Sequence, residues 1–369
     1  MSEVISEQEA ISQPEVICER NGPLGRLTLN RPDALHSLNP NMCQLMINAL
    51  QAWQHDDSVK AIWIDHQPGT RGFCAGGDIR LLSESGQKDG VEAWAFFRLE
   101  YQLNHYLHSY PKPVIAVIDG VTMGGGVGIS VHGRYRIATE NTTFAMPETG
   151  IALMPDVGGG WFLPRLDGEI GTWLAMTGSR LKAADTHAAG IATHYVGSQN
   201  IAALMDSVKT CLSENADLQA CLDAAQENPG EIKQLDDATR NIIDRCFAYD
   251  RAEDIIAALT KENSPWAEKQ LTTMASKSPQ SIKIALKQMR LGAAMETFAD
   301  NMAMEFTAVC RVVIDKEFHE GVRAVIVDKD NAPNWHYASV SDVPDDDVEA
   351  VFAPLPEDRQ WHPLPQALE

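Results

Sequence analysis

Two acidic side chains stand close together in a stretch that is otherwise mostly apolar or glycine-rich. Glu148 lies in FAMPETG, and Asp156 follows eight positions later in PDVGGG. Carboxylates can act as general acids, general bases or nucleophiles in catalysis. When apolar side chains surround them, they either have a partner or have a function. On spacing alone, two solvated loop acids would explain the pattern equally well.

A third acid interrupts an apolar stripe further towards the N-terminus. Residues 96–107 read FFRLEYQLNHYL, and a helical projection places Glu100 on the same face as Phe96, Leu103 and Leu107. Burial of a carboxylate is costly unless it has a partner or a function. The alternative is a glutamate at the edge of the stripe that reaches out to water.

Two glycine-rich segments could place backbone amides around a ligand. Residues 72–78 read GFCAGGD, and residues 119–128 read DGVTMGGGVG at the expected start of a helix. Glycine permits close approach of a ligand, and free amides at a helix N-terminus attract negative charge. The spacing does not match a dinucleotide fingerprint, and no GK[ST] follows as in a Walker loop. Alone, each segment is also compatible with an ordinary turn.

Strands and helices alternate in the first two hundred residues, which indicates an α/β core to position these groups. Apolar and β-rich patterns predict strands at Arg26–Asn30, Ala61–Asp65, Pro113–Ile118 and Tyr135–Ala138, and a helix over Asn39–Trp53. From about Gly197 helical periodicity dominates. It covers Leu204–Leu222, Asp236–Ala248, Ala252–Leu259, Pro279–Leu291 and Met295–Ile314, with helix-start signals at Asn263-Ser264-Pro265 and Ser278-Pro279.

The totals exclude several classes of function. The chain of 369 residues has 30 Lys and Arg against 51 Asp and Glu, a formal net charge of −21, so we expect no nucleic acid and no membrane partner. Its seven cysteines form no CxxC pair, which predicts reduced thiols and no metal site. The acidic N-terminus, MSEVISEQEA, has neither a signal core nor an arginine-rich transit pattern. We therefore predict a cytoplasmic protein.

Taken in order, these segments resemble the crotonase (enoyl-CoA hydratase/isomerase) superfamily. The resemblance is carried by LTLNRPDALHSLN, FCAGGDI, KPVIAVIDGVTMGGGVGIS and FAMPETGIALMPDVGGG. Within the superfamily the chain is most similar to the 3-hydroxyisobutyryl-CoA hydrolases, on these motifs together with SPQSIKIALKQMR and EFHEGVRAVIVDKDNAPNW. The likeness covers about residues 15–355.

The resemblance implies an α/β fold, a spiral of repeated ββα units with a helical C-terminal region. The expected parts are a disordered tail at 1–14, a core with the active site at 15–200, a helical region at 201–355 and a tail at 356–369. A small acyl-CoA is the implied ligand. No metal or organic cofactor is implied, because coenzyme A is part of the substrate, and a homo-oligomer is possible.

The family pattern also assigns roles to single residues. The amides of Gly77 and Gly125 form the oxyanion hole, and Glu148 and Asp156 are the catalytic acids. Glu100 joins Gly125, Glu148 and Asp156 in contacting the substrate. Backbone near Ala34, Ala75 and Asp78 meets coenzyme A. Arg31 and Arg80 are candidates for its phosphates only because they lie near these loops.

One departure from the hydratases decides between activities. Hydratases carry a glutamate two positions after the GGG and a second one in the PE segment, whereas this chain has Gly128 and Glu148 at those positions. Asp156 stands where hydratases usually have glycine. The resemblance therefore implies hydrolysis of the thioester of a short β-hydroxyacyl-CoA such as 3-hydroxyisobutyryl-CoA, in valine catabolism. A hydratase or isomerase of the same fold, and a non-catalytic acyl-CoA-binding protein, are the alternatives.

Overall fold

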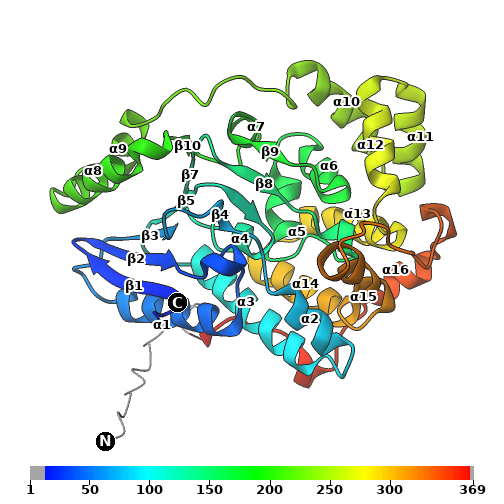
Figure 1. The fold of residues 1–369 in the computed structure, drawn as a ribbon, viewed down its shortest axis with the longest axis horizontal. Helices are drawn as coiled ribbons and strands as arrows, with labels where there is room; N and C mark the ends of the chain where they lie inside the picture. The colour runs from blue at the N-terminus through cyan, green and yellow to red at the C-terminus, as the bar shows by residue number, and fades with distance from the viewer. Residues whose placement is uncertain (1–12, 366–369) are drawn as a thin grey trace, which may run out of the picture.

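A computed structural model describes residues 13–365, and within them the strands form two sheets (Figure 1). The larger sheet has six strands in the order β1-β2-β3-β5-β7-β10, and the smaller has four in the order β4-β6-β8-β9. The strands are β1 Val16–Asn21, β2 Leu24–Leu29, β3 Ala61–His66, β4 Gly72–Cys74, β5 Val114–Ile118, β6 Val121–Met123, β7 Tyr135–Ala138, β8 Thr143–Ala145, β9 Leu181–Lys182 and β10 His194–Tyr195.

A ββα unit repeats along the chain and accounts for the two sheets. The first strands of successive units, β3, β5 and β7, lie side by side and parallel in the large sheet. The second strands, β4, β6 and β8, lie side by side and parallel in the small one. Helical structure follows each pair, as expected for a parallel sheet, whose strands need a crossover connection. This arrangement agrees with the spiral of ββα units that the sequence predicts.

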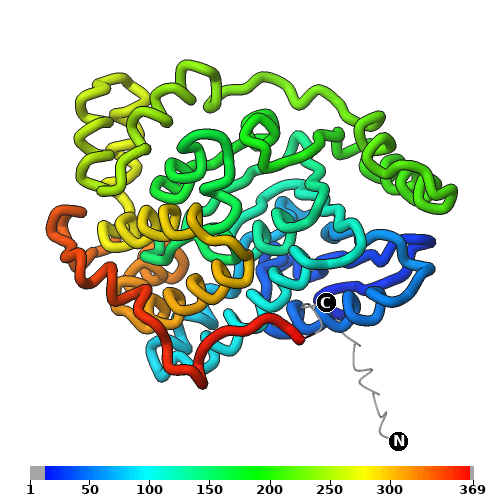
Figure 2. Tube along the Cα trace, turned by 180° about the vertical axis from the view of Figure 1, so that it is seen from behind, coloured from blue at the N-terminus to red at the C-terminus, as the bar shows by residue number. Residues whose placement is uncertain are grey.

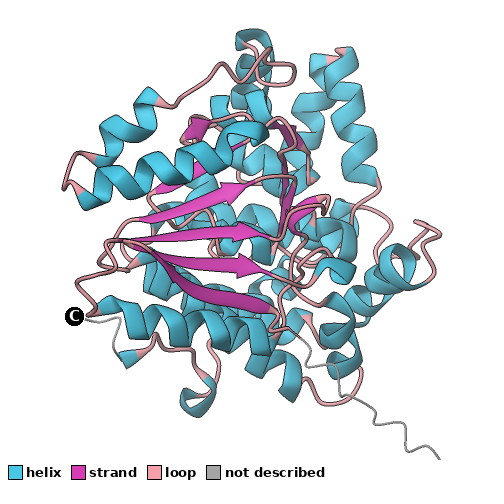
Figure 3. Ribbon diagram, turned by 60° about the vertical axis from the view of Figure 1, so that its left-hand side comes forward, coloured by secondary structure: helices cyan, strands magenta, loops and turns pink. Residues whose placement is uncertain are grey.

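The central strands β3 and β5 of the large sheet are buried on both faces, which explains their nearly continuous apolar sequences. In β3, Ile62 and Ile64 belong to the main core, whereas Ala61 and Trp63 face a second core. The second core is completed by helices α8 (Ile201–Ser213) and α9 (Leu218–Ala224), which lie over the sheet (Figures 1 and 3). Side chains alternate along a strand, so one strand serves two cores.

Most predicted helices are present, with one correction. The remaining helices are α1 Pro40–Gln54, α2 Ile79–Gly86, α3 Val91–His108, α4 Gly125–Gly128, α5 Gly159–Phe162, α6 Ile170–Thr177, α7 Ala183–Ala188, α10 Asp237–Phe247, α11 Ala252–Glu262, α12 Pro265–Ala275, α13 Pro279–Ala294, α14 Phe298–Val312, α15 Lys316–Val322 and α16 Asp345–Phe352. The hydroxyls of Ser264 and Ser278 cap α12 and α13, as their helix-start signals predict. The single helix predicted over Leu204–Leu222 is wrong, because Asn215, with φ of 55°, adopts a left-handed conformation and separates α8 from α9.

The C-terminal helices cover the core on the side away from α8 and α9. Figure 2 shows α13 and α14 in yellow and orange, with the red C-terminal segment along the outside of this layer. α3 packs against α1, α2 and α14, so it lies between the core and that layer. Among the described residues, no helix is both long and apolar enough to cross a bilayer.

The two terminal segments are described only in part. The disordered tail predicted at 1–14 lies outside the described residues except for 13 and 14. The tail predicted at 356–369 is described to residue 365, and there Arg98 of α3 donates hydrogen bonds to the carbonyls of Arg359 and Gln360.

Candidate active site

The carboxyl ends of three neighbouring strands of the small sheet meet at one cavity of about 440 Å³. Gly77 follows β4, Gly125 follows β6, and Glu148 follows β8, and all three line the cavity. Because β4, β6 and β8 run parallel, their carboxyl ends share one edge of the sheet. Sites in α/β proteins form at such an edge. Glu100 from α3 and Asp156 from the loop before α5 complete the lining.

Two backbone amides in this cavity have no acceptor. Within the described residues, neither the Gly77 nor the Gly125 N–H donates a hydrogen bond to a protein group. The two segments are neighbours, since a Cβ added to Gly76 would lie 3.9 Å from the nitrogen of Gly125. A Cβ added to Gly125 would collide with Oε1 of Glu100. Paired free amides are the donors that stabilise a developing oxyanion.

The acids are buried, which excludes the alternative of solvated loop and edge acids. Glu100, Glu148 and Asp156 are 2%, 6% and 5% exposed. Oε1 of Glu100 and Oε2 of Glu148 have no hydrogen-bond partner among the described residues. Burial, and then the charge of Asp156, raise the pKa of Glu100 and of Glu148 well above the ordinary value. Both glutamates therefore hold a proton more tightly than a free carboxyl group does.

Asp156 differs because it has a donor. The hydroxyl of Tyr101, next to Glu100 in α3, donates to Oδ2 of Asp156 at 2.8 Å. Burial raises the pKa of Asp156 to about 6, although the Tyr101 hydroxyl opposes the shift. A hydrogen bond to the charged form favours ionisation. The negative charge of the cluster therefore rests first on Asp156.

The loop that carries Asp156 is held in a strained conformation. Val157 has a φ of 51°, a conformation that β-branched residues rarely adopt. His132 Nε2 lies 2.7 Å from the Val157 carbonyl oxygen, and the buried Glu305 accepts from the amides of Gly158 and Gly160 at 2.7 and 2.8 Å. The sequence analysis missed Glu305, although it lies three positions after the buried Met302 of α14 and so interrupts an apolar stripe as Glu100 does.

The position of the missing hydratase glutamate is filled. A Cβ added to Gly128 would lie 2.6 Å from Cβ of Val157 and 2.8 Å from Nδ2 of Asn104. Val157 follows Asp156 directly, so the same turn that presents the new acid closes the space for the old one. The turn that presents Asp156 therefore leaves no room for a side chain at Gly128.

Of the predicted coenzyme A contacts, only Ala75 lines the cavity. Ala34 and Asp78 do not line it. The Asp78 side chain caps α2 and accepts from Arg31 at 2.9 Å, so it has a structural role. The two loops do touch, because the Ala75 amide donates to the Leu35 carbonyl at 3.0 Å. Contact of Ala34 and Asp78 with coenzyme A stays a prediction.

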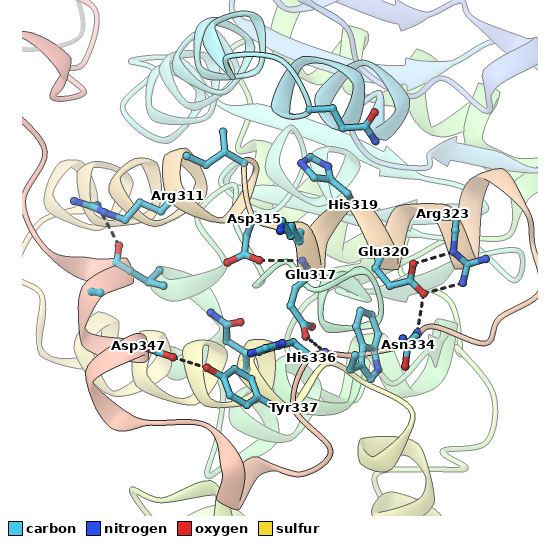
Figure 4. A pocket seen from close by; sticks show the side chains of 17 residues that line it. Arg311, Asp315, Glu317, His319, Glu320, Arg323, Asn334, His336, Tyr337 and Asp347 are labelled. Carbon is cyan, nitrogen blue, oxygen red and sulfur yellow. Dashed lines mark hydrogen bonds and ion pairs between the residues drawn. The ribbon is translucent and has the colours of Figure 1, made fainter.

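A larger cavity, of about 1370 Å³, lies on the C-terminal helices and contains none of the predicted residues (Figure 4). We call it the outer cavity, and the one with Glu148 the inner cavity. In the outer cavity Arg323 forms ion pairs with Glu320, Asp328 and Asp330, and the Tyr337 hydroxyl donates to Asp347. No group of three or more His, Cys, Asp or Glu side chains in the described part of the chain is placed to hold a metal ion.

Comparison with known proteins agrees with this geometry. The model of the enoyl-CoA hydratase/isomerase family matches residues 24–352. The chain belongs to this family. Curated relatives named mitochondrial 3-hydroxyisobutyryl-CoA hydrolase include those of Rattus norvegicus, 43% identical over 92% of this chain and 89% of the relative, and of Homo sapiens, 41% identical over 92% and 89%.

Solved structures of family members confirm the fold. A protein titled carnitinyl-CoA dehydratase from Mycobacterium thermoresistibile superposes with a TM-score of 0.87 at 36% identity, over 94% of this chain and 98% of the other. One titled enoyl-CoA hydratase from Rhodobacter sphaeroides has a TM-score of 0.83 at 32% identity, over 94% and 99%. The crotonase-type α/β fold predicted from the sequence is therefore correct.

The predicted cytoplasmic location is contradicted, because these curated family members are named as mitochondrial. The prediction rested on the composition of the N-terminus and on cysteines that indicate a reducing compartment. Reduced cysteines do not distinguish one reducing compartment from another, so they do not favour the cytoplasm over the mitochondrion.

Proposed function

We propose that this enzyme hydrolyses the thioester of 3-hydroxyisobutyryl-CoA, or of a similar short β-hydroxyacyl-CoA, to the free acid and coenzyme A. The observation that carries the proposal is the space at Gly128, which Val157 and Asn104 close, so that Glu148 has no second glutamate beside it as a hydratase would. The relatives at 41–43% identity, named as hydrolases of this substrate, support the same reaction.

In the proposed mechanism the thioester carbonyl lies between the Gly77 and Gly125 amides. These donors stabilise the oxyanion as the carbonyl carbon becomes tetrahedral. Since the amides belong to the backbone and have no other acceptor, they are ready before the substrate arrives. The thiolate of coenzyme A leaves when the tetrahedral intermediate collapses, and it takes up a proton.

Glu148 supplies the attack in one of two ways. Its carboxylate adds to the carbonyl and forms a mixed anhydride that water then hydrolyses, or it removes a proton from a water molecule that adds directly. Either role needs the ionised form, and the raised pKa of Glu148, caused by burial and the charge of Asp156, makes that form more basic. Asp156 orients the water or the substrate hydroxyl, and Glu100 binds that hydroxyl or tunes Glu148.

Single turnover in ¹⁸O-water separates the two roles of Glu148. Label found in the Glu148 carboxyl group after one turnover supports the anhydride. Label confined to the product acid excludes an anhydride that water opens at the Glu148 carbonyl carbon, and leaves the general base or opening at the acyl carbon.

The test of the function itself is release of free thiol from 3-hydroxyisobutyryl-CoA by the wild type and by Glu148→Ala. We expect turnover by the wild type and its loss in the variant. Glu320→Gln in the outer cavity is the matched control and should keep full activity. Absence of thiol release by the wild type on every short acyl-CoA would sink the proposal.

Hydration or dehydration is the second candidate, because two similar solved structures are titled as a dehydratase and a hydratase. It predicts a change in absorbance of the enoyl thioester without free thiol. Thiol release without double-bond chemistry excludes it.

A further inference from the structure

Two basic side chains line the inner cavity and have no counterion. Arg180 lies between α6 and β9, and Lys277 lies between α12 and α13, far apart in the sequence. Within the described residues neither side chain donates a hydrogen bond, and neither forms an ion pair within 4.0 Å. The charge of Glu148 raises the pKa of Lys277, yet no ion pair joins the two in the described part of the chain.

The two cations also repel each other. The pKa of Lys277 is lowered by burial and by the positive charge of Arg180, and only Glu148 opposes the shift. The chain has 51 acidic residues against 30 basic ones, so acidic counterions for these two cations are abundant in the sequence. A half-buried ammonium next to a like charge costs free energy unless an anion joins them.

The surrounding backbone leaves the Lys277 ammonium accessible. A Cβ added to Gly150 would lie 3.4 Å from Nζ, and one added to Gly178, where φ is 63°, would lie 3.7 Å from it. Glycine at both positions therefore keeps larger side chains away from the ammonium. Arg180 is exposed, and it lines the same cavity as Ser276 and Asn331, which are exposed as well. The pair thus stands where the cavity opens to solvent.

Of the two cations predicted to meet the coenzyme A phosphates, one is paired and the other lies outside the cavity. Arg31 donates to Asp78 at 2.9 Å and to the Ser37 carbonyl at 2.9 Å, and it lies 3.6 Å from Glu15. Arg80 does not line the cavity. Arg31 and Arg80 were predicted only because they lie near the loops in the sequence. The cations that line the cavity are Arg180 and Lys277.

We propose that Arg180 and Lys277 form a subsite for a phosphate of the coenzyme A portion of the substrate. The inference rests on the proposed function, which supplies the ligand. The acyl thioester of such a substrate is neutral, and its phosphates carry the negative charge. A guanidinium offers a fork of donors to phosphate oxygens, and an ammonium adds a point charge beside it.

The experiment compares two substrates that differ in their phosphates. Wild type, Arg180→Gln and Lys277→Gln are assayed with 3-hydroxyisobutyryl-CoA and with the 3-hydroxyisobutyryl thioester of pantetheine, which has no phosphate. We expect each variant to raise KM for the CoA substrate roughly 10-fold, the scale of one charged hydrogen bond, with kcat nearly unchanged. KM for the pantetheine substrate should not change.

Further arms sharpen the assignment. The dephospho-CoA thioester, which lacks only the 3′-phosphate, shows whether the pair binds that group or the diphosphate. Arg180→Lys and Lys277→Arg keep the charge and should recover part of the loss. For the wild type, KM for the CoA substrate should rise with ionic strength more steeply than in either Gln variant.

Two results would overturn the subsite. An equal loss on both thioesters would mean that the pair acts on the acyl group or on Glu148, and no change on either would mean that it binds nothing. If the wild type hydrolyses neither thioester, the proposed function fails. The phosphate subsite is then tested separately, by calorimetric measurement of the binding of free coenzyme A. Weaker binding by the Gln variants still supports the subsite, and equal binding refutes it.

Discussion

The two cavities of this protein differ in how completely their polar groups are paired. The outer cavity is about three times the volume of the inner one, at about 1370 against 440 Å³. Several of its charged groups are bound to one another, as Arg323 is to Glu320. In the inner cavity Glu100 and Glu148 each have an oxygen that no described group bonds. Buried groups without partners are rare and costly, so their concentration marks the functional cavity better than size does.

The difference also has a structural origin. The outer cavity lies among helices and a loop that bond to each other, for example where the Asn334 amide donates to Glu320. The inner cavity lies at the ends of parallel strands, where backbone amides and following side chains have no next strand to bond. A network of paired groups holds a surface together, whereas unpaired groups remain available for a substrate. The following predictions test this contrast, from the largest expected effect to the smallest.

Removal of the Glu148 carboxylate should show the functional difference between the two cavities most clearly. Glu148→Gln should lower kcat roughly 10²–10⁴-fold, the range for loss of a general base, measured by thiol release. Asp347→Asn in the outer cavity should leave kcat unchanged. Equal losses in both variants would contradict the distinction between the cavities.

The oxyanion amides can be displaced without removal of any side chain. Gly125→Ala brings a methyl group against Oε1 of Glu100, and loss of one such donor costs roughly 10²–10³ in kcat. Gly69→Ala is the control, because Gly69 lies in a turn with φ of 88°, and a Cβ added there would meet no atom within 4 Å. The control should lose some stability and keep its kcat.

Glu305 should act on the reaction through the Asp156 loop. In Glu305→Gln one carboxylate oxygen becomes an amide that cannot accept from the Gly158 or Gly160 N–H, and misplacement of Asp156 should lower kcat by up to about 10²-fold. KM should change little. A drop in Tm alone, with normal kcat and an unchanged pH profile, would show that Glu305 only stabilises the fold.

The charge of Asp156 should be visible in the pH profile. Because burial and then that charge raise the pKa of Glu148, the acid limb of kcat/KM should lie above the ordinary glutamate value of 4.5 in the wild type. Asp156→Asn removes the charge, so its acid limb should move to lower pH while the maximum rate falls. An acid limb that stays in place would show that Asp156 does not influence the group that titrates.

Stability should respond with opposite signs in the two cavities. Burial and the charge of Asp156 raise the pKa of Glu100. Above the ordinary pKa of a glutamate, the folded protein therefore still holds a proton on Glu100 that the unfolded chain has lost. Stability is therefore lost as pH rises through that window, and Glu100→Gln should remove this loss and raise Tm at neutral pH by a few degrees, at roughly 2–4 °C per kcal/mol.

In the outer cavity Glu317 accepts from the His336 amide and from the Ser278 hydroxyl. Glu317→Gln should lower Tm, because at least one of these bonds is lost. Calorimetry of both variants at neutral pH checks the pair. A fall of Tm in Glu100→Gln would contradict the prediction, because it would mean that the Glu100 carboxyl group has a stabilising hydrogen-bond partner in solution.

Local patterns determined much of the fold. Ser264 and Ser278 predict the starts of helices, because a cap joins residues only three positions apart. The apolar run over Pro113–Ile118 predicts β5, because a strand that is buried on both faces needs no polar side chains. The break at Asn215 was not predictable in this way, since apolar spacing continues on both sides of it and one residue in a left-handed conformation ends the helix.

The sequence alone determined which residues could take part: the acids Glu148 and Asp156, the glycine loops, and through them the family. Only the tertiary structure decided which groups are free. Arg31 is neutralised by Asp78, 47 positions away, and Glu305 holds Gly158 from 147 positions away. Arg180 and Lys277 have no partner among residues 13–365. Whether a charge has a counterion depends on distances in space, and no periodicity or motif along the chain records them.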